Sequence, residues 1–273
     1  MNKRRISQIW IYPIKSLAGI RLKKAVVQQK GLQYDRRWML VDKEGRFLTQ
    51  REHAEMALFK VTIENDFLIV TKQSQSIRLN LSSEPLGHFI KVKIWDDEVE
   101  AAEVAPEYSM WFSKHLGIEC KLVFFPENKQ RNVDPDFAIM NEQVSLADAY
   151  PFLIIGQASL DALNKKLEHT VSMKRFRPNF VFTEGLLAHE EDTWKNFKIG
   201  SVAFEGMKPC ARCVLTTVDP ETGEKGVEPL KTISTYRKQN GKVYFGENLL
   251  ARMEGEVHEG DAIEILDFKN ARI

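Results

Sequence analysis

The sequence has little cysteine and no excess of charge of either sign. Three cysteines occur among 273 residues, and so small and odd a number does not build a disulfide framework. The 39 basic and 38 acidic residues leave a formal net charge of +1. No overall field therefore attracts nucleic acid or a membrane surface. We expect neither as a partner, and any anion site must be built locally.

Long hydrophobic runs are also missing. No stretch reaches the roughly 20 apolar residues that span a bilayer. The basic start "MNKRR" is similar to that of a signal peptide, but the apolar run after it is short and contains Gln8, Pro13 and Lys15. These absences predict a cytoplasmic protein with reduced thiols. The length and the 43% hydrophobic content allow one large core or two small ones.

What the sequence does contain is mostly the pattern of β-strands. Residues 6–14 alternate as a strand does, and turn residues predict three hairpins, at 42–45, 65–66 and 96–97. Later strands are predicted over 179–184, 197–207, 242–251 and 261–268. Short strands with frequent turns indicate β-barrel or sandwich packing with a few helices. The expected fold is therefore mainly β, of the α+β class.

Two helices and a long loop interrupt these strands. Pro106 suits a helix start and Gly117 a helix end. A second helix is predicted over 159–168, with Ser159 as its cap. Between the two helices, residues 125–143 are polar and contain proline. This composition predicts a domain boundary or an active-site loop.

Cys210 and Cys213 stand at CxxC spacing in "MKPCARCVLTTVDP", and four interpretations compete. A zinc site needs about four ligands, but Cys120 and the six histidines offer none at ligand spacing. A redox dithiol belongs at the start of a helix, whereas the following "VLTTV" is predicted as a strand. Two ordinary buried thiols are the plain alternative. The fourth is a single thiolate on a soft metal centre, which Lys208 and Arg212 would favour.

The segment "KPCARCVLTTVDPETG" resembles the signature of the MOSC domain, named after the C-terminal part of molybdenum cofactor sulfurases. "RFRPNFVF" is similar to a second motif of that domain, and "IWIYPIKSLAG" and "GLQYDRRWMLVDKEGRFLTQRE" are similar to the MOSC N-terminal β-barrel domain. By pattern the chain resembles bacterial N-hydroxylated-compound reductases and mitochondrial amidoxime-reducing components. The resemblance implies an N-terminal β-barrel domain over 1–125 and a MOSC β-barrel domain over 126–273. It also implies that the chain belongs to a superfamily in which some members bind pyridoxal phosphate.

The resemblance further implies a molybdenum cofactor, a pyranopterin with a dithiolene and a terminal phosphate. Its metal ligand, and the catalytic residue, would be the second cysteine of the motif, Cys213, while Cys210 has no assigned role. The other residues implied to bind the cofactor are Lys15, Ser16, Arg36, Arg177 and Asn179. The residues implied to border a substrate cleft are Thr49, Arg51 and Asp148.

Each of these positions also has an ordinary interpretation. Lys15 and Arg36 could be solvated surface charges, as most lysines and arginines are. Asn179 could be a turn residue after Pro178. Asp219 is expected to shape a turn, because Asp-Pro initiates turns.

The implied activity is a two-electron reduction of N-hydroxylated small molecules. No cysteine follows Cys213, so the C-terminal iron–sulfur domain of some relatives, which needs four cysteines, is not expected. Electrons would come from a separate ferredoxin, flavodoxin or flavin reductase. The general acid cannot be identified from the sequence, because no pattern distinguishes the candidates Glu224, Glu228 and His189. The alternative is a protein that binds the cofactor, or carries sulfur on a cysteine, without turning over a substrate.

Overall fold

The computed structural model describes residues 4–81, 88–133, 141–185 and 187–273, and strands dominate it. Nineteen strands and three α-helices lie within these ranges. The mainly β class expected from the sequence is therefore confirmed.

The largest sheet holds nine strands. They are β1 (Arg5–Ile11), β2 (Ile20–Leu22), β12 (Phe152–Gly156), β13 (Phe180–Thr183), β14 (Trp194–Ile199), β15 (Val202–Arg212), β16 (Lys238–Gln239), β17 (Lys242–Ala251) and β19 (Ile263–Phe268). Their order is β19-β14-β15-β17-β12-β13-β1-β2, with β16 paired to β17. β12 and β13 run parallel, whereas β1 is antiparallel to both of its neighbours.

Three smaller sheets complete the strands. The first contains β5 (Trp38–Val41), β9 (Phe89–Ile94), β10 (Asp97–Glu103) and β11 (Lys121–Phe124), in the order β5-β11-β10-β9. The second contains β6 (Lys60–Glu64), β7 (Phe67–Lys72) and β8 (Gln75–Asn80). The third contains β3 (Lys24–Gln28), β4 (Gly31–Leu32) and β18 (Gly255–His258), in the order β18-β3-β4.

The helices are short. The α-helices are α1 (Pro106–Leu116), α2 (Gln157–Asn164) and α3 (Leu230–Ser234), and the 3-10 helices are η1 (Ala54–Leu58), η2 (Met173–Phe176), η3 (Glu190–Thr193) and η4 (Val214–Thr217). None of the helices within the described ranges is long and apolar enough to cross a membrane.

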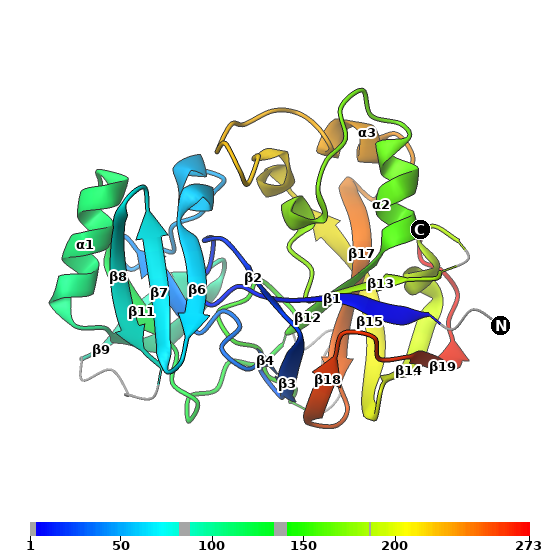
Figure 1. The fold of residues 1–273 in the computed structure, drawn as a ribbon, viewed down its shortest axis with the longest axis horizontal. Coiled ribbons are helices and arrows are strands. Elements are labelled where there is room, and N and C mark those ends of the chain that lie inside the picture. Colours follow the sequence, from blue (N-terminus) through cyan, green and yellow to red (C-terminus); the bar gives the residue numbers. More distant parts are fainter. Residues whose placement is uncertain (1–3, 82–87, 134–140, 186) are drawn as a thin grey trace.

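The elements gather in two lobes (Figure 1). β6, β7, β8 and α1 lie in the lobe on the left, and the large sheet with α2 and α3 forms the lobe on the right. Strands from before residue 125 also pair with strands beyond it, β1 with β13 and β3 with β18. The division of the chain at 125–126 stays a prediction, and the two lobes share the first strands of the chain.

Each lobe has its own apolar core. In the right lobe the rings of Phe152, Phe180 and Phe204 pack with centroids 5.5 to 6.0 Å apart. In the left lobe Phe59 packs against Phe112 of α1 at 5.8 Å. Full burial of such a side chain contributes roughly 2–3 kcal/mol. Each lobe is therefore stabilised by its own packed core.

Several predicted elements are confirmed. The turn at 65–66 joins the paired strands β6 and β7, and β17 and β19 match the predicted strands over 242–251 and 261–268. The turn at 42–45 is also formed, with the Gly45 amide donating to the Asp42 carbonyl, but an isolated bridge between Val41 and Phe47 stands where the sequence predicted a hairpin. α1 begins at Pro106, and Gly117 ends it with a left-handed φ of 69°. The predicted strand over 197–207 is instead parts of β14 and β15, which turn at Gly200. In the predicted loop over 125–143, residues 134–140 lie outside the described residues.

Three local predictions are wrong. The third hairpin turns at Trp95 and Asp96, one residue early. Ser159 does not cap a helix: α2 starts at Gln157, and the Ser159 hydroxyl inside it donates to Glu191 Oε1 at 2.9 Å. The segment "VLTTV" is not a strand but contains η4. There the Thr216 and Thr217 hydroxyls donate back to the carbonyls of residues 213 and 214, a local bonding that competes with a strand ladder.

Candidate functional site

One pocket of about 510 Å³ brings together every site residue predicted from the sequence. Both lobes contribute to its lining. The nine predicted residues on its wall are Lys15, Ser16, Arg36, Thr49, Arg51, Asp148, Arg177, Asn179 and Cys213. Segments that are up to about two hundred residues apart in the sequence therefore converge on one site.

The backbone is strained where three of these residues enter the pocket. Ser16, Arg36 and Arg177 have φ values of 68°, 51° and 54°, in the left-handed region that residues other than glycine seldom adopt. Such conformations persist only where the surrounding structure enforces them, and they cluster at functional sites. Here they turn the chain between β1 and β2, before β5 and after η2.

Bulges in β15 precede Cys213. The register of β15 against β17 shifts between Gly206 and Lys208 and again between Pro209 and Ala211. A bulge bends a strand and re-aims the side chains that follow. Cys213 comes directly after this strand, and its side chain is exposed to the pocket.

The two sulfurs of the CxxC pair have different surroundings. Cys213 Sγ lies 4.0 Å from Arg51 Nη1. Cys210 is half-buried against an apolar cluster that includes Phe176, and its sulfur accepts a bond from Arg212 Nη1 at 3.1 Å. The pair is therefore asymmetric, with the sulfur of Cys213 the more accessible of the two.

Lys15 is buried, not a surface charge. It is 6% exposed, and its Nζ donates to the Leu146 carbonyl at 2.8 Å and to Asp148 Oδ1 at 2.5 Å. Burial lowers the pKa of Lys15 to about 8, and the Asp148 carboxylate offsets only part of that effect. Removal from water would raise the pKa of Asp148, but the Lys15 ammonium outweighs this and holds it below its ordinary range. Both groups are charged at neutral pH.

Arg36 and Arg177 share one aromatic ring. Their guanidinium carbons lie 4.3 and 4.1 Å from the centroid of Tyr12. Arg36 pairs with Asp35 at 2.5 Å and donates to the Arg177 carbonyl at 3.2 Å. Burial lowers the pKa of Arg177 to about 10. Two cations around one ring with a single carboxylate, Asp35, leave positive charge that an anion would stabilise.

Asn179 is fully engaged by the protein. Its amide nitrogen donates to the Trp10 carbonyl and to Asp35 Oδ2, and its oxygen accepts from the Leu153 amide and from Arg36. An asparagine side chain has two donor and two acceptor positions, so direct contact with a ligand would require one of these bonds to break. In this structure Asn179 braces Arg36 and Asp35.

The lining of the pocket is strongly cationic. Among the described residues that line it, eight side chains are lysine or arginine and one, that of Asp148, is a carboxylate. The cations are Lys15, Arg36, Arg51, Arg177, Lys208, Arg212, Lys242 and Arg272. The near-neutral chain thus concentrates its positive charge at this site, as an anion-binding pocket requires.

The three acids left open by the sequence do not line the pocket. His189 is packed against Phe245, and burial lowers its pKa to about 4. The Glu228 carboxylate accepts from the Thr232 amide at the start of α3. Asp219 shapes a turn as predicted, because its Oδ1 accepts from the amides of residues 221 and 222.

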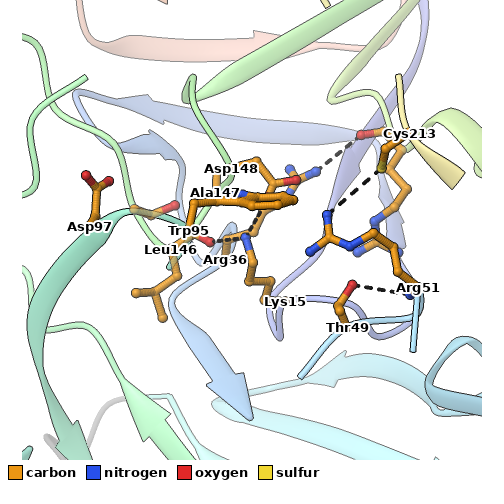
Figure 2. A network of polar contacts seen from close by, with 12 residues as sticks. Lys15, Arg36, Thr49, Arg51, Trp95, Asp97, Leu146, Ala147, Asp148 and Cys213 are labelled. Carbon is orange, nitrogen blue, oxygen red and sulfur yellow. Dashed lines mark hydrogen bonds and ion pairs between the residues drawn. The ribbon is translucent and has the colours of Figure 1, made fainter. Parts of the chain in front are cut away.

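Two further residues at this site were not found from the sequence. Trp95 stacks on Arg51, with the guanidinium carbon 4.1 Å from the ring centroid. Arg131 is buried and donates to the carbonyls of residues 145 and 147, which holds the loop that carries Asp148. Figure 2 shows Lys15, Asp148, Trp95, Arg51 and Cys213 in one network of contacts.

The donor set suits a sulfur-ligated, anionic cofactor better than a zinc ion. Across the described residues, no three or more histidine, cysteine, aspartate or glutamate side chains are grouped so as to hold a metal. What the pocket offers is one accessible thiol, Cys213, and a surplus of cations. A metal that brings its own sulfur ligands needs only one more from the protein, so the residues present fit the molybdenum cofactor.

Comparisons with known proteins agree with the sequence motifs. Models of the MOSC N-terminal beta barrel domain and of the MOSC domain match residues 3–119 and 141–264. Mitochondrial amidoxime-reducing component 1 of Mus musculus is 32% identical, over 96% of this chain and 82% of that protein. Mitochondrial amidoxime reducing component 2 of Bos taurus is 34% identical, over 85% and 72%.

A longer relative shares the same region. Molybdenum cofactor sulfurase of Drosophila pseudoobscura pseudoobscura is 31% identical over 89% of this chain, which spans 32% of that protein. The chain belongs to the MOSC-domain family, with a MOSC N-terminal β-barrel domain followed by a MOSC domain.

Proposed function

We propose that the protein is a molybdenum-cofactor-dependent reductase of N-hydroxylated compounds that receives its electrons from a separate protein. One observation carries the proposal: the nine predicted site residues, which come from six separate segments of the sequence, line one cationic pocket, and the accessible Cys213 is among them. The similarity to amidoxime-reducing components supports the reaction class. The similarity to a molybdenum cofactor sulfurase supports the cofactor.

Cys213 and the cations have separate tasks in this proposal. The Cys213 sulfur ligates the molybdenum, and the Arg51 guanidinium lies beside it, with Nη1 4.0 Å from Sγ. Lys15 uses two of its three N–H groups on Leu146 and Asp148, which leaves one for the phosphate. Arg177 and Arg36 contribute charge-assisted bonds to the same anion. When bound, the cofactor supplies the two-electron redox chemistry, while the protein supplies ligation, orientation and electrostatics.

The test is reduction of benzamidoxime by protein produced in a molybdate-supplied host, with NADH and a flavin reductase. Cys213→Ser is expected to abolish reduction, because the replacement removes the metal-binding sulfur and changes a single atom. Cys210→Ser is the matched control and is expected to keep most of the activity, because its sulfur packs against the apolar cluster. Equal loss in both variants would favour a dithiol and contradict the assignment.

Two further outcomes are informative in the same assay. Full turnover with NADH and no reductase would contradict the separate electron donor. A persulfide on Cys213 in the mass spectrum, without molybdenum or pterin, would favour a sulfur carrier in place of a reductase.

A further inference from the structure

Trp95 occupies an unusual position at the edge of the site. It forms the turn between β9 and β10 together with Asp96, and the residue is 52% exposed. Its φ of 57° is left-handed, although two-residue hairpin turns of this kind favour asparagine or glycine. A bulky aromatic residue in this conformation is an outlier. Neither burial nor turn geometry accounts for a tryptophan here.

The indole of Trp95 is nevertheless held in one orientation. Its Nε1 donates to Asp148 Oδ1 at 3.2 Å. Asp97, two residues later, accepts from Arg131 Nε at 2.8 Å, and Arg131 also bonds the carbonyls of the loop before Asp148. The hairpin is thereby tied to this loop at two points, and Figure 2 shows Trp95 beside Asp148 at the first of them. A side chain fixed in this way is preorganised for binding.

Trp95 lies one side chain away from the proposed metal ligand. The Arg51 guanidinium carbon is 4.1 Å from the Trp95 centroid, and Arg51 Nη1 is 4.0 Å from Cys213 Sγ. The Phe47 ring lies 5.5 Å from that of Trp95. Two aromatic rings therefore stand at the margin of the reaction site.

A second cavity begins at these aromatic rings. This groove, of about 810 Å³, is lined by Trp95 and shares Phe47, Thr49 and Arg51 with the cationic pocket. Its charges balance, since four lysine or arginine side chains face four carboxylates, whereas the first pocket is cationic. The groove therefore selects on shape and apolar contact and not on net charge.

We propose that this groove binds the distal group of the substrate, and that Trp95 makes it specific for neutral N-hydroxylated compounds conjugated to a planar aromatic ring. This inference rests on the proposed function, in which the cofactor fills the first pocket and leaves the adjoining groove to the substrate. A planar aromatic group stacks on a fixed indole, which adds to the gain from burying its surface. A small aliphatic group has no such face and gains nothing from Trp95.

The test compares benzamidoxime with acetamidoxime on the cofactor-loaded protein. Trp95→Ala is expected to raise both KM and the calorimetric Kd for benzamidoxime roughly tenfold, and to leave both values for acetamidoxime within about twofold. Trp95→Phe keeps a ring and is expected to restore most of the affinity. The matched control is Phe89→Ala, because Phe89 is on the same hairpin and is also 52% exposed. Phe89→Ala is expected to leave KM and Kd unchanged for both substrates.

The outcomes separate this inference from the proposed function. Calorimetry needs no turnover, so Trp95-dependent binding of benzamidoxime without any reduction would overturn the reductase and keep the groove. Reduction of both compounds with equal losses in Trp95→Ala would overturn the groove, since Trp95 would then act only through Arg51. No calorimetric binding of benzamidoxime, or no difference between Trp95→Ala and Phe89→Ala, would also overturn it.

Discussion

Replacing Lys15 by methionine should stabilise the cofactor-free protein while weakening its hold on the cofactor. The Lys15 side chain is 7% exposed, and burial lowers its pKa from 10.5 to about 8. That difference corresponds to roughly 3 kcal/mol of unfavourable free energy for the charged form at pH 7. Methionine fills a similar volume without the charge. It leaves the Leu146 carbonyl without this donor, which costs about 1 kcal/mol. A net gain of about 1–2 kcal/mol is expected.

The assay is urea unfolding at pH 7 of protein from a host grown without molybdate. Lys91→Met is the control, because the Lys91 side chain is 74% exposed, and it should change stability by less than about 0.5 kcal/mol. In wild type, stability should rise between about pH 8 and 10.5, where the unfolded chain still holds the Lys15 proton and the folded protein has lost it. Lys15→Met should lack this rise. A loss of more than about 1 kcal/mol of stability in Lys15→Met would refute the reasoning. So would an unchanged molybdenum content in Lys15→Met protein from a molybdate-supplied host.

Two other perturbations follow from the structure. Burial raises the pKa of Glu191 to about 7 and that of Glu247 to about 8, so the folded protein holds these protons longer than the unfolded chain. The free energy of unfolding should therefore fall as pH rises from about 4.5 to 8, and urea unfolding at a series of pH values measures this. Glu191→Gln should make the free energy of unfolding depend less steeply on pH, and an unchanged dependence in that variant would contradict the explanation. Arg131→Gln should loosen the loop before Asp148 and lower molybdenum retention after gel filtration severalfold, whereas full retention would show that Arg131 does not position the site.

The sequence predicted the site better than it predicted the local structure around it. Motif residues such as Lys15, Arg177 and Cys213 could be grouped because each motif has a recognisable spacing, and the structure places them on one pocket. The β-branched residues after Cys213 led to the wrong prediction of a strand. Threonines also suit a 3-10 helix when their hydroxyls donate to backbone carbonyls of the preceding turn. Ser159 was misplaced because its partner, Glu191, is distant in sequence.

The contributions of Trp95 and Arg131 could not be predicted, because they depend on contacts across the fold. Trp95 reaches Asp148 from a hairpin 53 residues away, and Arg131 bonds backbone carbonyls, which carry no sequence signal. The hydrogen bonds that occupy Asn179 could not be predicted either, since its four partners come from three separate segments of the chain. Sequence reasoning finds residue types that suit a ligand, but only the structure shows which of them the protein already uses.

The most direct test of the central claim is the molybdenum and pterin content of the protein from a molybdate-supplied host, measured by elemental analysis and by fluorescence of the oxidised pterin. Wild type is expected to carry both in stoichiometric amounts. Cys213→Ser is expected to lose molybdenum, and Cys210→Ser is expected to retain both. Wild-type protein with neither molybdenum nor pterin, or Cys213→Ser protein with a full complement of metal, would contradict the account.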